Sequence, residues 1–243
     1  MRVEPDTIHS DPTVRPHWTG PGVFQVVPGI FRIPLPLPFD GLRAVNVYAV
    51  VDDGGLVLVD SGWAVTEARE LLEKALAALG AGLPDVRRFL VTHVHRDHYN
   101  MAVLVRREFG AAVALGAGER ATLDLLCDPG HRLMDNHWAV LARCGAGELV
   151  EPLRQRAQQY PHDPSDWAPP DDWLGGGADI ALAGRTLQVV ETPGHTRGHV
   201  IFVDAAAGLM FAGDHVLPHI TPSIGYEPAP SALPLGDYLH SLR

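Results

Sequence analysis

The sequence contains little cysteine: Cys127 and Cys144 are its two cysteines among 243 residues, and they are not spaced as a CxxC pair. Two such residues make neither a disulfide framework nor a cysteine-based zinc knuckle, and we expect reduced, half-buried thiols. The chain also lacks an apolar run near the roughly 20 residues that a transmembrane helix requires. Its N-terminal segment lacks the apolar core of a secretory signal. We therefore expect a cytoplasmic protein that does not span a membrane.

Basic residues are in the minority. The chain has 19 Lys and Arg residues against 29 Asp and Glu residues, which gives a formal net charge of −10. Nucleic-acid binding requires a basic face, so this balance argues against a nucleic-acid partner. The sequence also lacks the GxSxG motif of a serine hydrolase, so a serine nucleophile is not indicated.

The chain has the composition of an ordinary globular protein, with 46% hydrophobic and 20% charged residues. Neither an internal repeat nor a linker is evident, so we expect one domain over residues 1–243. Apolar periodicity and turn residues predict strands over residues 22–38, 44–51, 56–60, 86–92, 111–115, 185–192, 199–204 and 208–214, and helices over 65–79 and 99–110. The first strand contains prolines and is expected at a sheet edge. Residues 116–177 show a scattered helical pattern and no predicted strand. The fold class is α/β, with two sheets covered by helices.

Four metal-ligand side chains stand close together in "THVHRDH", directly after a predicted strand: His93, His95, Asp97 and His98. In extended backbone, side chains at i and i+2 point the same way, so His93 and His95 can bind one ion. Asp97 and His98 follow where the chain turns into a helix, and they can face a second point nearby. Imidazole and carboxylate together suit Zn²⁺, and also Fe or Mn.

Two further candidate ligands follow predicted strands later in the chain. His195 lies in the turn of "ETPGHTRGH", and Asp214 follows Gly213 in "FAGDHVL". Glycine beside a ligand allows the backbone to approach an ion closely. We expect His93, His95, His195 and Asp214 to converge on one point.

These motifs, together with "LVLVDSG", resemble the metallo-β-lactamase superfamily and its glyoxalase II-like metallohydrolases. The resemblance spans residues 45–217 and implies an αββα sandwich of two mixed β-sheets covered by helices. It implies a hydrolase of a small ester-like substrate, such as a thioester or a lactone, that acts through metal-bound hydroxide at two zinc ions. It assigns His93, His95 and His195 to the first ion, Asp97 and His98 to the second, Asp214 as the bridge, Asp97 as the catalytic residue, and Asp60 as a support for the ligands.

Substrate contacts are expected from the helical insertion at about 116–177, because members of this family often build the pocket wall from inserted helices. His131, His137 and Trp138 are the candidates, with ordinary helix packing as the rival interpretation. His219 lies in a proline-bounded loop and could approach the same pocket. Arg96 could attract an anionic substrate, or it could be a solvated surface charge.

The chain departs from the family pattern after Asp214. Two-metal members usually supply one more histidine downstream, and His215, His219 and His240 do not match its motif. The resemblance therefore predicts that this chain lacks its C-terminal part and binds the second metal weakly. The alternative function is a mononuclear iron dioxygenase acting on a persulfide, with Fe²⁺ bound by His93, His195 and Asp214. A β-lactamase proper ranks below both, because those enzymes are exported. The sequence leaves the oligomeric state open.

Overall fold

The computed structural model describes residues 8–9, 18–38, 42–130, 135–157 and 162–243. The larger of two β-sheets has eight strands in the order of the chain. Pairing is parallel between β1 and β2 and from β5 to β8, and antiparallel from β2 to β5, so this sheet is mixed as expected. Its strands are β1 (Ile8–His9), β2 (Val23–Val27), β3 (Ile30–Pro36), β4 (Ala44–Asp52), β5 (Gly55–Val59), β6 (Val86–Val91), β7 (Ala112–Gly116) and β8 (Asp172–Leu174).

The smaller sheet has four strands in the order β12-β11-β10-β9. Its strands are β9 (Asp179–Leu182), β10 (Arg185–Glu191), β11 (Val200–Asp204) and β12 (Leu209–Phe211). All its pairs are antiparallel, so this sheet is not mixed, in contrast to the expectation. Antiparallel pairing follows from short turns, such as the one between β9 and β10, which leave no room for a crossover helix.

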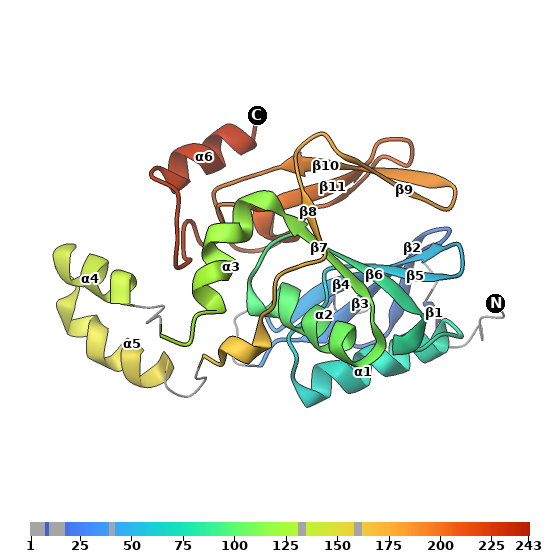
Figure 1. Cartoon of the computed structure of the whole chain (residues 1–243), viewed down its shortest axis with the longest axis horizontal. Coiled ribbons are helices and arrows are strands. Elements are labelled where there is room, and N and C mark those ends of the chain that lie inside the picture. The colour runs from blue at the N-terminus through green and yellow to red at the C-terminus, as the bar shows by residue number, and fades with distance from the viewer. Residues whose placement is uncertain (1–7, 10–17, 39–41, 131–134, 158–161) are drawn as a thin grey trace.

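Two apolar layers hold the sheets in place. The four-stranded sheet packs on one face of the eight-stranded sheet, and buried residues of both fill the space between them, including Leu90, Val189 and Phe202. Helices α1 (Thr66–Ala78) and α2 (Arg96–Phe109) cover the opposite face of the larger sheet (Figure 1). Helix α1 buries Leu72 and Leu76, which recur at helical spacing on one face.

The remaining helices are short. They are α3 (Arg120–Leu126), α4 (Asp135–Arg143), α5 (Val150–Ala157) and α6 (Pro234–Ser241), with 3₁₀ turns at Leu83–Asp85, Ala117–Glu119, Gly147–Leu149, Pro164–Asp166 and Gly213–His215. Helices α4 and α5 lie side by side away from both sheets (Figure 1). Helix α6 contacts the loop after β10, where Ser241 Oγ donates to the carbonyl of Pro193 at 2.9 Å. In the part of the chain that the structure describes, no helix is long and apolar enough to cross a bilayer.

Most predicted elements are confirmed, including the β4–β5 hairpin, α1 and the last three strands. The expectation of an edge strand over residues 22–38 is wrong, because this segment forms β2 and β3, and β3 lies between β2 and β4. Strand β2 pairs only with residues 30–32 of β3, so Pro34 and Pro36 fall where β3 has a partner on one side.

Two other expectations need correction. Residues 116–177 contain a strand after all, because Asp172–Leu174 pairs with β7 as β8. Its three residues are too few to produce a periodic signal. Cys127 is half-buried as expected, but Cys144 is exposed.

Candidate metal centre

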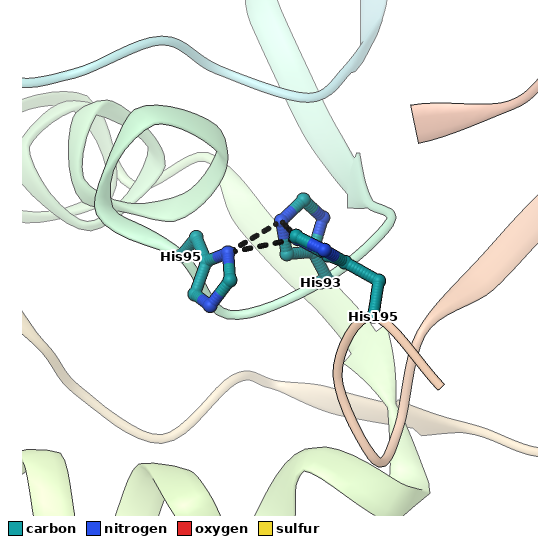
Figure 2. Close-up of side chains that lie close together, drawn as sticks. All are labelled: His93, His95 and His195. Carbon is teal, nitrogen blue, oxygen red and sulfur yellow. Dashed lines mark hydrogen bonds between the residues drawn. The ribbon is translucent and has the colours of Figure 1, made fainter. Parts of the chain in front are cut away.

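Three histidine side chains converge at one edge of the two sheets. His93 follows β6, His95 directly precedes α2, and His195 lies in the loop between β10 and β11. Nε2 of His93 lies 3.1 Å from Nδ1 of His95, and Nε2 of His195 lies 3.3 Å and 3.0 Å from these two atoms. Figure 2 shows the three rings pointing toward one another. The structure thus brings together the three histidines that were expected to converge.

The outer nitrogens of two of these rings face backbone carbonyls. Nδ1 of His195 lies 2.7 Å from the carbonyl oxygen of Ser223, and Nε2 of His95 lies 3.2 Å from that of Tyr226. Because a carbonyl oxygen can only accept, each outer nitrogen carries the proton and donates it. The inner nitrogen of each neutral ring is then a bare lone pair, which is the form that coordinates a metal.

Asp60 orients two more imidazoles through its buried carboxylate. Thr92 Oγ1 donates to Asp60 Oδ1 at 2.9 Å, so it accepts from Nδ1 of His93, which lies 3.0 Å away. Nδ1 of His98 donates to Asp60 Oδ2 at 2.9 Å. Asp60 has a backbone φ of 59°, which is uncommon outside glycine and is retained here beside the cluster. Asp60 thus lies where a support for the ligands is expected.

A second group forms around His98 in the first turn of α2. Nε2 of His98 lies 3.5 Å from Asp97 Oδ2 and 3.3 Å from Asp214 Oδ1. The other oxygen of Asp214, Oδ2, lies 3.4 Å from Nε2 of His195 in the first group. The Asp214 carboxylate therefore faces both groups, as a bridging ligand would.

The backbone around Asp214 is fixed by close packing. Gly213 has a φ of +49°, and a Cβ there would lie 2.6 Å from Thr92 Oγ1 and 2.8 Å from His199 Nε2. This close approach requires glycine. The N–H of Asp214 donates to Nε2 of His199 at 3.1 Å, so Nδ1 of His199 carries the proton and donates to Thr192 Oγ1 at 2.8 Å. His199 positions the Asp214 backbone.

Burial keeps the three converging histidines neutral. It lowers the pKa of His93 well below the usual value, with further lowering from the neighbouring imidazoles. Burial and the adjacent His195 lower the pKa of His95 to about 4. The pKa of His195 is also lowered, again mainly by burial. Neutral rings are ready to bind a cation without first losing a proton.

The second group has the opposite electrostatic character. Burial disfavours the charged form of His98, but the carboxylates of Asp60, Asp97 and Asp214 outweigh it and raise its pKa well above the usual value. Burial opposes the charged forms of Asp97 and Asp214, and the His98 charge nevertheless lowers the pKa of both. A proton on His98 thus balances the negative charge of the surrounding carboxylates, as a bound cation would.

Two sets of residues could each hold a divalent metal ion, and the second set contains His93 rather than Asp97. Side-chain atoms that could serve as ligands lie within 4.8 Å of one another in the set His93, His95 and His195 and in the set His93, His98 and Asp214. Imidazole nitrogens on a tetrahedral zinc ion are roughly 3.3 Å apart. The separations in the first group, 3.0 to 3.3 Å, are close to this value. Imidazoles with a carboxylate suit zinc and iron alike.

A cavity of about 620 Å³ opens onto the cluster. His95, Asp97, His195 and Asp214 border it, so both groups are accessible to a small molecule. A separate cavity of about 720 Å³ lies between α4, α5 and residues 224–230, and its walls are mostly apolar. The two cavities share His137, Tyr226 and Glu227. A ligand at the cluster could therefore extend into the apolar cavity.

The residues that were expected to contact the substrate lie in different parts of the structure. His137 borders both cavities, and its ring lies 4.5 Å from that of Tyr226. Trp138 lines only the apolar cavity of the two. His219 is exposed, lines neither of them, and lies beside Trp18, with 6.0 Å between the ring centroids. His131 lies outside the described residues.

Several residues of the site were not found from the sequence. Ser223 and Tyr226 contribute backbone carbonyls, which any residue can supply, so their identity gives no signal. Thr92 directly precedes the cluster and could have been considered as its partner. Glu227 is buried between the two cavities, where it accepts hydrogen bonds from Thr122 Oγ1 at 2.5 Å and from the N–H of Arg197 at 2.6 Å.

Comparison with known proteins identifies a family that the chain matches. Residues 40–124 and 130–242 match the family model described as the metallo-beta-lactamase superfamily. The crystal structure of a metallo-beta-lactamase family protein from Thermus thermophilus is 32% identical. The superposition has a TM-score of 0.76 and covers 90% of this chain and 69% of the Thermus thermophilus chain.

Two curated relatives are named as hydrolases of acyl compounds. A hydroxyacylglutathione hydrolase from Haemophilus influenzae is 25% identical over 67% of this chain and 62% of its own length. An atrochrysone carboxyl ACP thioesterase from Aspergillus fumigatus is 24% identical over 73% of this chain and 31% of its own length. The chain thus spans less than two thirds of the length of these relatives.

Proposed function

Because the chain belongs to the metallo-β-lactamase superfamily, we propose that it is a metal-dependent hydrolase of a small ester-like substrate, a thioester or a lactone. The names of the two curated relatives describe an acylglutathione hydrolase and an ACP thioesterase, so a thioester is the first class to test. We propose zinc as the native metal, bound at two sites.

The observation that carries this proposal is the hydrogen bonding of the imidazoles. His93, His95 and His195 each direct an outer nitrogen at a fixed acceptor and an inner nitrogen at the other two rings. Three lone pairs 3.0 to 3.3 Å apart repel one another unless a cation lies between them. This arrangement supports a metal-binding role, because core packing does not require three lone pairs to face one another.

The distances support the following ligand roles. His93, His95 and His195 would hold the first ion, Asp97 and His98 the second, and Asp214 would contribute one oxygen to each. When bound, such ions would supply a water of lowered pKa and would polarise a carbonyl. Asp97 borders the cavity and can accept a hydrogen bond from the attacking water, and it can then pass the proton to the leaving group. Asp60 holds the His98 ring so that Nε2 faces the second site.

The two cavities suit a substrate with a polar reacting end and an apolar remainder. The scissile carbonyl would lie at the cluster, beside Asp97 and His195. An acyl chain would extend past His137 into the apolar cavity, where Trp138 contributes to the wall. Burial lowers the pKa of His137, so the ring is neutral at pH 7 and suits an apolar or neutral group.

The position of His95 bears on the alternative function. An iron dioxygenase that used His93, His195 and Asp214 would leave His95 outside the ligand set. Nδ1 of His95 instead lies within 3.1 Å of both other imidazole nitrogens, which favours the hydrolase.

The test is elemental analysis of protein purified without added metal, combined with a hydrolysis assay on thioesters and lactones. We expect about two zinc ions per chain and turnover of at least one of these classes. His195→Ala should lose the first ion and the activity, whereas His240→Ala, at an exposed histidine on α6, should retain both. One iron per chain, without hydrolysis of either class, would overturn the proposal in favour of the dioxygenase.

A further inference from the structure

Arg96 is a cationic side chain at the cavity that the proposed mechanism does not use. It is the first residue of α2, between His95 and Asp97, and it lines the cavity of about 620 Å³. Among the described residues that line this cavity, it is the only Arg or Lys. Its guanidinium carbon lies 5.1 Å from the ring centroid of Trp63 and 5.9 Å from that of Trp167. Both distances are within the range of a cation–π contact.

The Trp167 side of this arrangement is firmly anchored. Trp167 is only 5% exposed, and its Nε1–H donates to the carbonyl of Val94 at 3.4 Å. The flanking backbone is bound to α2 as well, because Asn100 Nδ2 donates to the carbonyl of Asp166 at 2.7 Å and Tyr99 OH donates to that of Ala168 at 2.6 Å. The arginine therefore lies against a fixed surface, which reduces the entropy lost when it binds a ligand.

The guanidinium has no polar partner among the described residues, since no hydrogen bond or ion pair of Arg96 occurs there. Arg32 and Arg185, which are also partly buried, are paired. Arg32 donates to Asn46 Oδ1 at 3.0 Å, and Arg185 donates to Asp204 Oδ2 at 2.9 Å. A guanidinium has five N–H donors in a planar fork, and the two tryptophan rings near Arg96 do not satisfy these donors by conventional hydrogen bonds.

The charge of the cavity makes this arginine distinctive. Asp97, Asp214 and Glu227 contribute carboxylates to the lining, and the whole chain carries a formal net charge of −10. Apart from bound metal, Arg96 is thus the one feature of the described lining that would attract an anion. A planar guanidinium fork binds carboxylate and phosphate oxygens in pairs.

We propose that Arg96 is a specificity-determining residue that binds a carboxylate or phosphate group of the substrate. This inference rests on the proposed function, because it places the scissile carbonyl at the cluster and an anionic group beside it. The substrate is then an anionic ester or thioester. Trp63 and Trp167 position the guanidinium, and its N–H groups bind the anion.

The experiment compares two thioesters, one with a free carboxylate and one in which that carboxylate is masked as a methyl ester. S-Acetyl-3-mercaptopropionate has a free carboxylate, and its methyl ester does not. The ratio of kcat/KM for the first to that for the second is measured in the parent protein and in Arg96→Gln and Arg96→Lys. Arg120→Gln is the matched control, because Arg120 also lies against a tryptophan, Trp173, but lines neither cavity.

We expect the parent protein and the control to prefer the anionic thioester, and Arg96→Gln to reduce that ratio about 10- to 100-fold. Arg96→Lys should give an intermediate ratio, because it retains the charge and loses the fork. A ratio that is the same in the parent and Arg96→Gln would overturn the inference and leave the hydrolase proposal intact.

A binding measurement separates the two proposals if neither thioester is hydrolysed. Glutarate and butyrate are titrated calorimetrically into metal-loaded protein. A preference for glutarate that Arg96→Gln removes and Arg120→Gln retains would support the anion site even without turnover. Equal binding of the two acids by the parent protein would overturn it. Circular dichroism shows whether Arg96→Gln is folded, and Arg96→Lys repeats the comparison if it is not.

Discussion

The carboxylate of Asp60 accepts a hydrogen bond from Nδ1 of His98 at 2.9 Å, although 38 positions separate the two residues in the chain. Asp60 Oδ1 also accepts from the N–H and the hydroxyl of Thr92, and the hydroxyl in turn faces His93. One buried carboxylate thereby fixes the protons of two imidazoles, one in each proposed metal site.

Asp60→Asn should weaken the second metal site. An amide can present an N–H to Nδ1 of His98, which would move the ring proton to Nε2 and block the ligand atom. Loss of such an outer partner typically costs about 10- to 100-fold in metal affinity. Metal titration followed by calorimetry would measure this loss. Asp53→Asn, at an exposed turn, is the control, and equal affinities in the two variants would contradict the role of Asp60.

Asp97→Asn should abolish most turnover while the first ion stays bound. The amide cannot accept a proton, and it binds the second ion more weakly, whereas His93, His95 and His195 are unchanged. We expect kcat to fall about 10²- to 10⁴-fold, with metal content measured on the same sample. Asp124→Asn, exposed on α3, should behave like the parent protein. A near-parental kcat in Asp97→Asn would exclude its catalytic role.

The two ions should differ in affinity, and the difference should grow at low pH. The first site has three neutral imidazoles, whereas the second must displace a proton from His98, whose pKa is raised by three carboxylates. Below that raised pKa, affinity at the second site should fall about 10-fold per pH unit, because each ion bound releases one proton. Chelator titration at several pH values would show one ion released first, together with activity. Release of both ions at one chelator concentration would point to a balanced site instead.

Glu119→Gln should remove a loss of folding stability that we expect in the parent protein as the pH rises. Burial and then the nearby Glu227 raise the pKa of Glu119 to about 8, and its Oε2 has no partner among the described residues. The folded state therefore binds more protons than the unfolded state between the ordinary and the raised pKa. The contribution of Glu119 to the free energy of unfolding is fully present below pH 4.5 and is lost as the pH rises through about 8.

The loss in the parent protein should reach at most ~1.4 kcal/mol per pH unit from this one group. Urea unfolding from pH 5 to 8 would measure it as the difference between the parent protein and Glu119→Gln. The exposed Glu70→Gln is the control. A difference that does not change with pH would mean that Glu119 is already ionised in the folded protein.

The sequence by itself determined the candidate ligand side chains and most of the elements that carry them. His93 and His95 alternate at the end of a strand, so local periodicity pairs them. His195 and Asp214 each follow another strand, and the resemblance to a known family grouped them with this pair. The same local signals predicted the β4–β5 hairpin and α1. They failed at β8, which has three residues and exists because β7 provides a partner.

Only the tertiary structure decided how the ligands are oriented and what surrounds them. The carbonyls of Ser223 and Tyr226 fix the protons of two imidazoles, and a backbone carbonyl leaves no mark in the residue type. The partners of Arg96 are equally remote from local sequence: Trp63 follows β5 and Trp167 follows a 3₁₀ turn, and both reach the arginine only when the chain is folded. Long-range packing created these contacts, and sequence periodicity describes only short-range order.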